Sequence, residues 1–216
     1  MPQADRQGTP SGVPEGDAVR DLQAEGGAPV EPASEAEAPA PVAGARRKLV
    51  VLLACLALGI YAADLITKTI VLRTLPEYGP PTVIIPEVLQ FRLIFNSGAA
   101  FSIGTGMTII FTIIAASVVV AIIRTARKLR SLPWAICLGM LLGGALGNLT
   151  DRLFRHPGGL QGHVVDFIEI FPGHWPIIEN FPIWNIADAS IVCGGILAVI
   201  LAWRGYQIDG TRETGK

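Results

Sequence analysis

The chain has 216 residues, of which only 16% are charged, and its mean hydropathy is +0.48. Soluble proteins carry about 25% charged residues, so this composition excludes an ordinary soluble globule. The formal net charge is −1 and no Lys/Arg run is interleaved with aromatic residues, which excludes a strongly basic nucleic-acid-binding protein. The three cysteines, Cys55, Cys137 and Cys193, lie in apolar stretches, which is typical of small buried hydrophobic residues rather than of a disulfide framework.

The first 45 residues differ in composition from the rest of the chain. They contain eight acidic side chains, two basic ones, seven prolines and no aromatic residue. Such a segment cannot bury enough apolar surface to offset the entropy cost of ordering it. We therefore expect residues 1–45 to be a disordered acidic tail, followed by a membrane domain at 46–204 and a cytoplasmic C-terminal tail at 205–216.

Four apolar stretches follow this tail, each close to the length that a helix needs to cross the hydrocarbon core of a membrane. They span residues 49–72, 107–123, 132–150 and 183–203. These runs are too long and too uniformly apolar for barrel strands, so helices are the expected spanning structure. The sequence therefore predicts an all-α integral membrane protein with four transmembrane helices.

Basic residues flank these stretches unequally. Arg46, Arg47 and Lys48 precede the first stretch, and four more basic residues lie in the short loop at 124–130. Because cytoplasmic loops carry an excess of Lys and Arg, we expect this loop and both termini to be cytoplasmic. The two longer loops then face the extracytoplasmic side.

Two local patterns add detail to this arrangement. Gly139, Gly143 and Gly147 recur every four residues in the third stretch, and small residues at this spacing favour close packing between helices. In the first outer loop, β-branched and aromatic runs at 82–85 and 91–95 predict a small extracytoplasmic β element.

Polar side chains lie where lipid makes them costly, since a charge at the bilayer centre costs about 2.5 to 3.5 kcal/mol. Asp64 lies toward the outer end of the first stretch, and residues 148–152 end the third. Asp188 lies near the outer end of the fourth stretch, and Asp166 precedes it in the outer loop. These carboxylates converge on one side of the membrane and are candidates for a functional site.

Some of these residues have structural explanations beside the functional one. Lys68 lies one helical turn from Asp64 and would neutralise it. Asp151 and Arg152 are adjacent at a helix end, where a structural ion pair or a snorkelling arginine is an alternative to catalysis. Asn148 on the same helix face would hydrogen-bond a neighbouring helix. The residues alone leave both interpretations open.

Asp166 and Asp188 have no such explanation, because each has apolar neighbours and no Lys or Arg within four positions. Two such carboxylates that share a proton supply one acid and one base, as in aspartic proteases. His156, His163 and His174 form no His-Glu-x-x-His motif and no Gly-x-Ser-x-Gly motif occurs, which argues against zinc and serine hydrolases. We therefore expect a carboxylate-based site without a metal ion or cofactor.

Five blocks of sequence, in order, resemble the prolipoprotein signal peptidases, also called signal peptidase II. The blocks are DLITK at 64–68, NSGAAFS at 96–102, GGALGNLTDR at 143–152, VVDF at 164–167 and FPIWNIAD at 181–188. The resemblance covers residues 49–203. Leu65, Trp184 and the order Ala189-Ser190 depart from the family's usual residues, and none of these changes removes a carboxylate.

The resemblance implies an intramembrane aspartic endopeptidase in the bacterial cytoplasmic membrane, with its active site on the extracytoplasmic side. Its substrates would be diacylglyceryl-modified prolipoproteins, cut N-terminal to the modified cysteine. Asp166 and Asp188 would be catalytic, and a further set would bind substrate or shape the site: Asp64, Asn96, Gly98, Asn148, Arg152 and Asn185. The alternative from another class is a transporter or proton relay that uses Asp64 and Asp188, against which the lack of an internal repeat argues.

Overall fold

The computed structural model describes residues 43–98, 107–174 and 181–213. The chain divides into a unit of residues 1–40 and a unit of residues 41–216, and all described residues belong to the second. Most of the expected acidic tail therefore lies outside the described residues. Its last part does not, because the first helix already begins at Ala43, in a segment whose Ala, Arg and Lys residues have high helix propensity.

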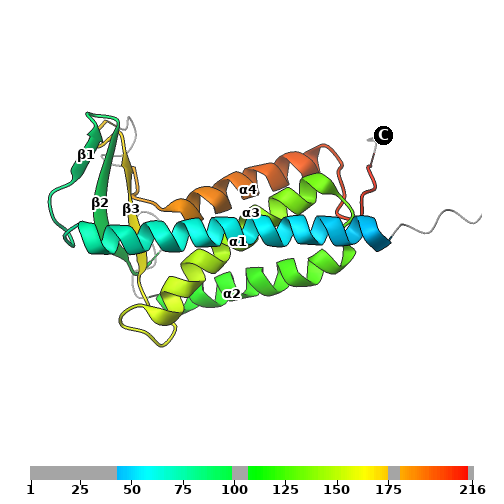
Figure 1. The fold of residues 1–216 in the computed structure, drawn as a ribbon, viewed down its shortest axis with the longest axis horizontal. Coiled ribbons are helices and arrows are strands. Elements are labelled where there is room, and N and C mark those ends of the chain that lie inside the picture. Colours follow the sequence, from blue (N-terminus) through cyan, green and yellow to red (C-terminus); the bar gives the residue numbers. More distant parts are fainter. Residues whose placement is uncertain (1–42, 99–106, 175–180, 214–216) are drawn as a thin grey trace, which may run out of the picture. The chain divides into compact units, whose positions relative to one another are not determined.

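Four long helices make up most of this unit (Figure 1). They are α1 (Ala43–Thr74), α2 (Thr108–Thr125), α3 (Leu132–Phe154) and α4 (Ile186–Trp203), and the short 3-10 helix η2 (Ala126–Lys128) extends α2. Each of the four is long and apolar enough to cross a membrane. The four predicted spans are confirmed, and the chain is a multi-pass membrane protein.

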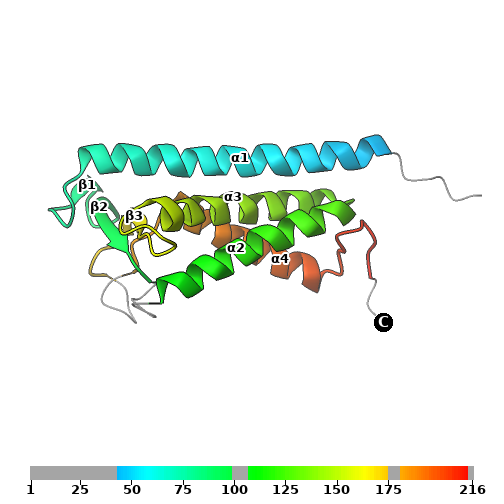
Figure 2. The ribbon, with the colours of Figure 1, turned by 90° about the horizontal axis from the view of Figure 1, so that it is seen from below.

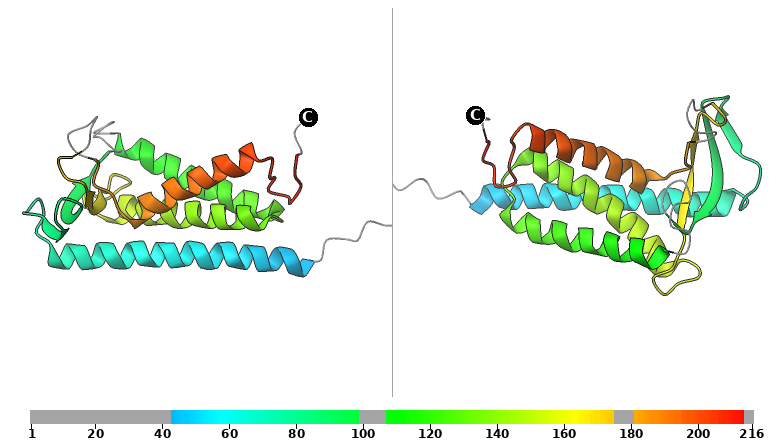
Figure 3. Two further views of the ribbon diagram at one scale, coloured as in Figure 1. Left: turned by 90° about the horizontal axis from the view of Figure 1, so that it is seen from above. Right: turned by 180° about the vertical axis from the view of Figure 1, so that it is seen from behind.

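Helix α3 lies between α1 on one side and α2 and α4 on the other (Figures 2 and 3). Its glycines allow this close approach. A Cβ atom at Gly143 would lie 2.7 Å from the backbone oxygen of Ala57 in α1, and one at Gly144 would lie 2.5 Å from that of Ala187 in α4. The helix-packing interpretation of the glycine pattern is therefore confirmed.

A three-stranded antiparallel sheet lies at the end of the bundle where α1 ends (Figure 1). Its strands are β1 (Thr82–Ile85), β2 (Leu89–Asn96) and β3 (Val164–Ile170), in the order β1-β2-β3. The small β element is confirmed, and β3 adds a strand that the sequence did not predict. In the β2–β3 register Asn96 lies opposite Val164 and Ile94 lies opposite Asp166, so Asp166 is part of a strand rather than of a loop.

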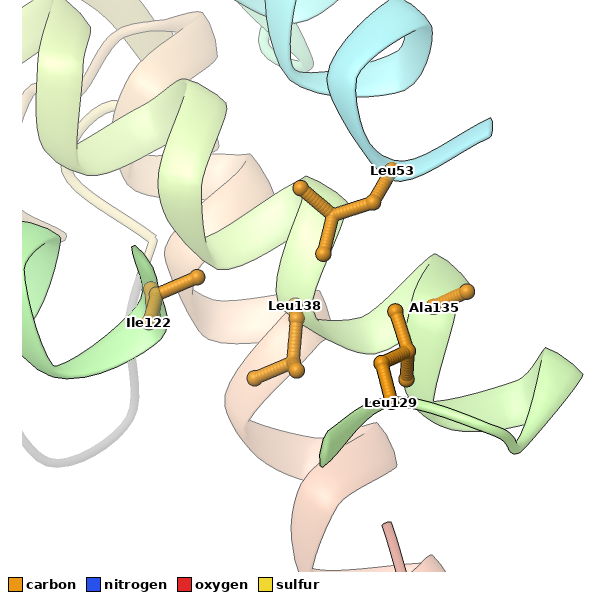
Figure 4. Packing of buried hydrophobic residues seen from close by; sticks show 5 residues of the cluster. All are labelled: Leu53, Ile122, Leu129, Ala135 and Leu138. Atoms are coloured by element: carbon orange, nitrogen blue, oxygen red, sulfur yellow. The ribbon is translucent and has the colours of Figure 1, made fainter. Parts of the chain in front are cut away.

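Two hydrophobic clusters lie at opposite ends of the unit. One joins the helices away from the sheet and consists of Leu53, Ile122, Leu129, Ala135 and Leu138 (Figure 4). The other packs the sheet against the end of α1 and consists of Val71, Leu93, Val165, Phe167 and Ile168. Because the two residues that flank Asp166 belong to this second cluster, the backbone at Asp166 is held firmly against the bundle.

Candidate active site

Asp166 is the third residue of β3 and is 1% exposed. Two amide side chains satisfy its carboxylate. Asn185 donates from Nδ2 to Oδ1 at 2.6 Å, and Asn96, at the end of β2, donates from Nδ2 to Oδ2 at 2.8 Å. The sheet and the start of α4 thus position this carboxylate together.

Asp188 lies in the first turn of α4 and is partly exposed. Asn148 of α3 donates from Nδ2 to Oδ1 of Asp188 at 2.7 Å. Asn185 is the N-cap of α4, and its Oδ1 accepts the backbone N–H of Asp188 at 2.8 Å, as expected of a capping asparagine. One asparagine therefore contacts both aspartates, through its amide nitrogen to Asp166 and its amide oxygen to Asp188.

Electrostatics connect the two carboxylates as well. Burial raises the pKa of Asp166, the negative charge of Asp188 raises it further, and the result is a pKa of about 7. The hydrogen bonds from Asn96 and Asn185 and the charge of Lys68 act in the opposite direction but do not outweigh these effects. With Asp188 ionised, the Asp166 carboxyl group therefore retains a proton up to near-neutral pH.

Lys68 of α1 lies at the centre of a buried charge cluster beside this pair. Its Nζ is 2.7 Å from Oδ2 of Asp64 and 2.8 Å from Oδ2 of Asp151. Asp64 also accepts the backbone N–H of Ala187 at 2.9 Å, which links α1 to the first turn of α4. A Cβ at Gly147 would lie 2.5 Å from Asp64 Oδ2, so glycine at this position makes room for the ion pair. The expected pairing of Asp64 with Lys68 is confirmed.

Among the described residues Asp151 and Arg152 form no ion pair with each other, so that alternative is wrong. Adjacent residues do not face each other on a helix, and the two side chains point to different partners. Asp151 forms ion pairs with Lys68 and with Arg155 and accepts the backbone N–H of Val165 at 3.2 Å, so it ties α3 to α1 and to β3.

Arg152 instead contacts the segment before α2. Its Nη2 donates to the backbone oxygen of Gly98 at 3.0 Å, and its guanidinium lies 5.6 Å from the centre of the Phe111 ring. The backbone N–H of Gly98 donates to Asn96 Oδ1 at 3.0 Å. The buried Nη1 of Arg152 has no hydrogen-bond partner among the described residues. Residues 99–102 of the NSGAAFS block lie outside the described part of the chain.

The comparison with known families decides what kind of protein this arrangement belongs to. A family model described as signal peptidase (SPase) II matches residues 56–204. The chain belongs to the signal peptidase II family. A lipoprotein signal peptidase of Streptomyces griseus subsp. griseus is 55% identical over 166 residues, which cover 77% of this chain and 80% of the relative. One from Mycobacterium tuberculosis is 46% identical over 177 residues, covering 82% and 81%.

Two solved structures of bacterial membrane enzymes are similar to this chain. One, titled as a bacterial membrane enzyme, has a TM-score of 0.60 at 28% identity and covers 81% of this chain and 96% of its own. A second with a similar title has a TM-score of 0.56 at 30% identity and covers 74% and 94%. The chain is therefore a peptidase with the architecture of a known bacterial membrane enzyme.

The structure brings all eight candidate residues of this signal peptidase II into one network of hydrogen bonds and ion pairs. Sequence reasoning missed the central place of Lys68, although a lysine inside an apolar span is a signal for it. In the described ranges no group of three or more His, Cys, Asp or Glu residues is arranged to hold a metal ion.

Proposed function

We propose that this signal peptidase II is an intramembrane aspartic endopeptidase that removes signal peptides from diacylglyceryl-modified prolipoproteins. Cleavage falls N-terminal to the modified cysteine. The observation that carries this proposal is the pair of interacting carboxylates, Asp166 with a pKa raised to about 7 and Asp188 with Asn148 as its hydrogen-bond donor. Such a pair supplies an acid and a base at the same pH.

In the proposed reaction, ionised Asp188 takes a proton from a water molecule, whose oxygen attacks the scissile carbonyl carbon. Protonated Asp166 donates to the carbonyl oxygen, which gives a neutral tetrahedral diol. The C–N bond then breaks as Asp188 delivers its proton to the leaving amine, and a diol hydroxyl returns a proton to Asp166 as the carboxylic acid product forms. The sum is addition of one water molecule, and no covalent enzyme intermediate arises.

We assign Arg152 a role in binding the substrate. A buried donor without a partner costs free energy, so Nη1, which has no partner among the described residues, favours an incoming acceptor such as a backbone carbonyl of the substrate. Asn96 and Gly98 fix the neighbouring backbone, since Gly98 accepts from the same guanidinium. We assign these residues, together with Asn148, Asn185 and Asp64, to shaping the site and positioning the substrate.

The position of Asp166 and Asp188 near one membrane surface fits a substrate that is anchored there by its lipid. Asp188 lies in the first turn of a spanning helix, and Asp166 lies in a strand that packs against the end of α1. The other end of the bundle carries the basic residues of the α1 start and the α2–α3 loop, which by the positive-inside rule face the cytoplasm. We therefore place the site at the extracytoplasmic face of the cytoplasmic membrane, within a catalytic domain of residues 46–204.

The transporter alternative finds no support in the described residues. Asp64 would have to exchange protons as a relay, but it forms a buried ion pair with Lys68 and accepts a hydrogen bond from the Ala187 backbone N–H.

The proposal includes no nucleic acid as a partner. Its partners are the lipid bilayer, which the helices span, and the lipidated substrate protein.

Incubation of the purified full-length protein, in phospholipid nanodiscs, with a prolipoprotein tests the proposal. Two substrates are compared by mass spectrometry, one carrying the diacylglyceryl group on its cysteine and one without it. The proposal expects a single cut directly before the modified cysteine and no cut in the unmodified protein. Equal cleavage of both, or cleavage at another bond, would overturn it.

A further inference from the structure

Lys68 is a fully buried cation that the proposed reaction does not use directly. Besides its ion pairs with Asp64 and Asp151, its Nζ donates to Oδ1 of Asn148 at 3.0 Å. An ammonium group only donates hydrogen bonds, so the side of the Asn148 amide that faces Lys68 must be the oxygen. The amide nitrogen is then directed to the other side, where it donates to Asp188.

The Asn148 amide thus joins the Lys68 ammonium group, which only donates hydrogen bonds, to the Asp188 carboxylate, which only accepts them. Rotating the amide by half a turn would place its NH₂ against Lys68 and its oxygen against ionised Asp188, and both contacts would be lost. Asn185 adds a weaker donor to the same oxygen at 3.3 Å, which favours the same orientation. The two carboxylates on Lys68, from α1 and α3, keep its ammonium group aimed at Asn148.

We infer that Lys68 is a positioning residue for the general base: it locks Asn148 in the orientation that hydrogen-bonds Asp188. This inference rests on the proposed aspartic mechanism. Lys68 also acts at a distance, because its positive charge lowers the pKa of Asp166. The charged groups that face it are Asp64 on its own helix, Asp151 on α3 and, beyond Asn148, Asp188 on α4, with Arg155 paired to Asp151 on the far side.

Lys68→Met tests this inference, because methionine keeps much of the side-chain volume but donates no hydrogen bond. We expect kcat to fall by about 100-fold with KM changed less than threefold. Loss of the positive charge raises the pKa of Asp166 further, so the basic limb of the pH–rate profile moves to higher pH. Arg155→Gln is the matched control, since it removes an ion pair from Asp151 but has no contact with Asn148. The control keeps the wild-type pH profile.

A double-mutant cycle with Asn148→Ala separates positioning from general stabilisation. If Lys68 acts through Asn148, adding Lys68→Met to Asn148→Ala lowers kcat by less than threefold. Additive losses together with an unshifted pH profile overturn the inference. If the wild-type protein cleaves nothing, the proposed function itself fails, which is a different outcome.

A charge-balanced variant keeps the test decisive if Lys68→Met does not fold. Asp64→Asn combined with Lys68→Met removes one anion and one cation from the buried cluster and leaves no uncompensated charge at this site. Compared with Asp64→Asn alone, the double variant should lose a further 30-fold or more in kcat. Equal activity of these two variants would contradict the role of Lys68.

A separate observation concerns the other end of the bundle. A groove of about 350 Å³ lies between α1, α2 and α3, and its walls are apolar, including Leu53, Ile122 and Leu142. Two exposed arginines also line it, Arg46 at the start of α1 and Arg127 in η2. Neither arginine forms an ion pair with a carboxylate in the part of the chain that the structure describes.

The groove lies far from the proposed catalytic site. Arg46 precedes Asp64 by 18 residues on one continuous helix, which corresponds to about 27 Å at 1.5 Å per residue. The substrate's lipid anchor, held near the aspartates, therefore does not reach it. An apolar groove lined by two arginines that have no carboxylate partner among the described residues matches one acyl chain and the phosphate of an anionic phospholipid.

We propose that this groove binds an anionic phospholipid, with an acyl chain against Leu53 and Ile122 and the phosphate between Arg46 and Arg127. Native mass spectrometry of the purified full-length protein, titrated with dioleoyl phosphatidylglycerol or dioleoyl phosphatidylcholine, tests it. We expect phosphatidylglycerol to bind more tightly, and Arg46→Gln with Arg127→Gln to reduce the preference by about tenfold. Ala54→Phe, which fills the groove, should weaken binding of both lipids.

Arg47→Gln with Lys48→Gln is the matched control, because it removes the same amount of charge from the same end of the bundle without changing a residue that lines the groove. The preference for phosphatidylglycerol should persist in this control. An equal loss in the control, or no effect of Ala54→Phe, would show that the basic surface as a whole attracts lipid and would overturn the groove as the site.

Discussion

Asn185 donates a hydrogen bond of 2.6 Å from its Nδ2 to Oδ1 of Asp166. The same side chain caps α4 by accepting the backbone N–H of Asp188. The position of one aspartate relative to the other is therefore set by a residue that also starts the helix. Catalytic geometry and helix stability are coupled at this point of the chain.

Asn185→Ala removes both contacts at once. Loss of an N-cap typically costs about 1 kcal/mol, and loss of the Asn185 donor leaves Asn96 as the remaining amide that holds the Asp166 carboxylate. We expect a lower melting temperature and a fall in kcat of at least tenfold. Ser131→Ala is the control, since Ser131 is the N-cap of α3 but its side chain makes no capping hydrogen bond. A variant at position 185 that loses stability but keeps wild-type kcat would contradict the coupling.

The dependence of turnover on pH should be bell-shaped, because the proposed reaction needs the singly protonated pair. Below the acid limb both carboxyl groups carry protons and no base remains. Above the basic limb, whose midpoint we expect near pH 7 from the raised pKa of Asp166, the acid is lost and turnover falls. Initial rates with a lipidated peptide between pH 4 and 9 measure both limbs.

A variant of Asn96 tests whether the basic limb of the pH–rate profile reports the pKa of Asp166. Its hydrogen bond lowers the pKa of Asp166, so Asn96→Ala should move the basic limb to higher pH. A rate that rises steadily with pH in the wild-type protein, or a basic limb that moves down in the variant, would be inconsistent with Asp166 as the acid.

Asp151→Asn should act mainly on stability. Asp151 is 1% exposed and joins Lys68, Arg155 and the backbone of Val165. Breaking a buried ion pair from one side typically costs about 3 to 5 kcal/mol. We expect a clear drop in melting temperature in detergent, with kcat of the folded fraction within tenfold of wild type. An activity loss as deep as that of the catalytic aspartates would refute this assignment.

The proposed topology is open to chemical labelling in whole cells. In a background without native cysteines, Glu87→Cys in the turn between β1 and β2 should react with a membrane-impermeant maleimide added outside. Lys128→Cys, in the basic loop after α2, should react only after the membrane is opened. Strong labelling of position 128 from outside would reverse the orientation.

The helices were predictable from the sequence because an apolar run of about 20 residues has few other structures in a membrane. Their exact ends were not. The expected start at Ile183 moves to Ile186, since Asn185 caps the helix and Trp184 pairs with the Ile168 backbone instead. Such pairing is a tertiary event, which local composition does not encode.

Strand β3 was missed for a related reason. Six of its seven residues are buried, so the alternation of polar and apolar side chains that marks a half-buried strand is absent. Asp166 and Asp188 could be named as candidates from the residues alone, because a carboxylate in apolar surroundings stands out, whereas Asn96, Gly98 and Asn185 were named only through the family resemblance. The contacts between the site residues could not be predicted, since Asn148 lies 80 residues from Lys68 and one sequence does not reveal which distant side chains meet.

The most direct test of the account is turnover and binding of a lipidated prolipoprotein by Asp166→Asn and Asp188→Asn, measured on the same preparations. Asparagine is nearly isosteric with aspartic acid but neither takes up nor releases a proton under these conditions. We predict that both variants bind substrate within threefold of wild type and that turnover falls by at least a thousandfold in each. Substantial cleavage by either variant would show that the Asp166–Asp188 pair does not carry the chemistry.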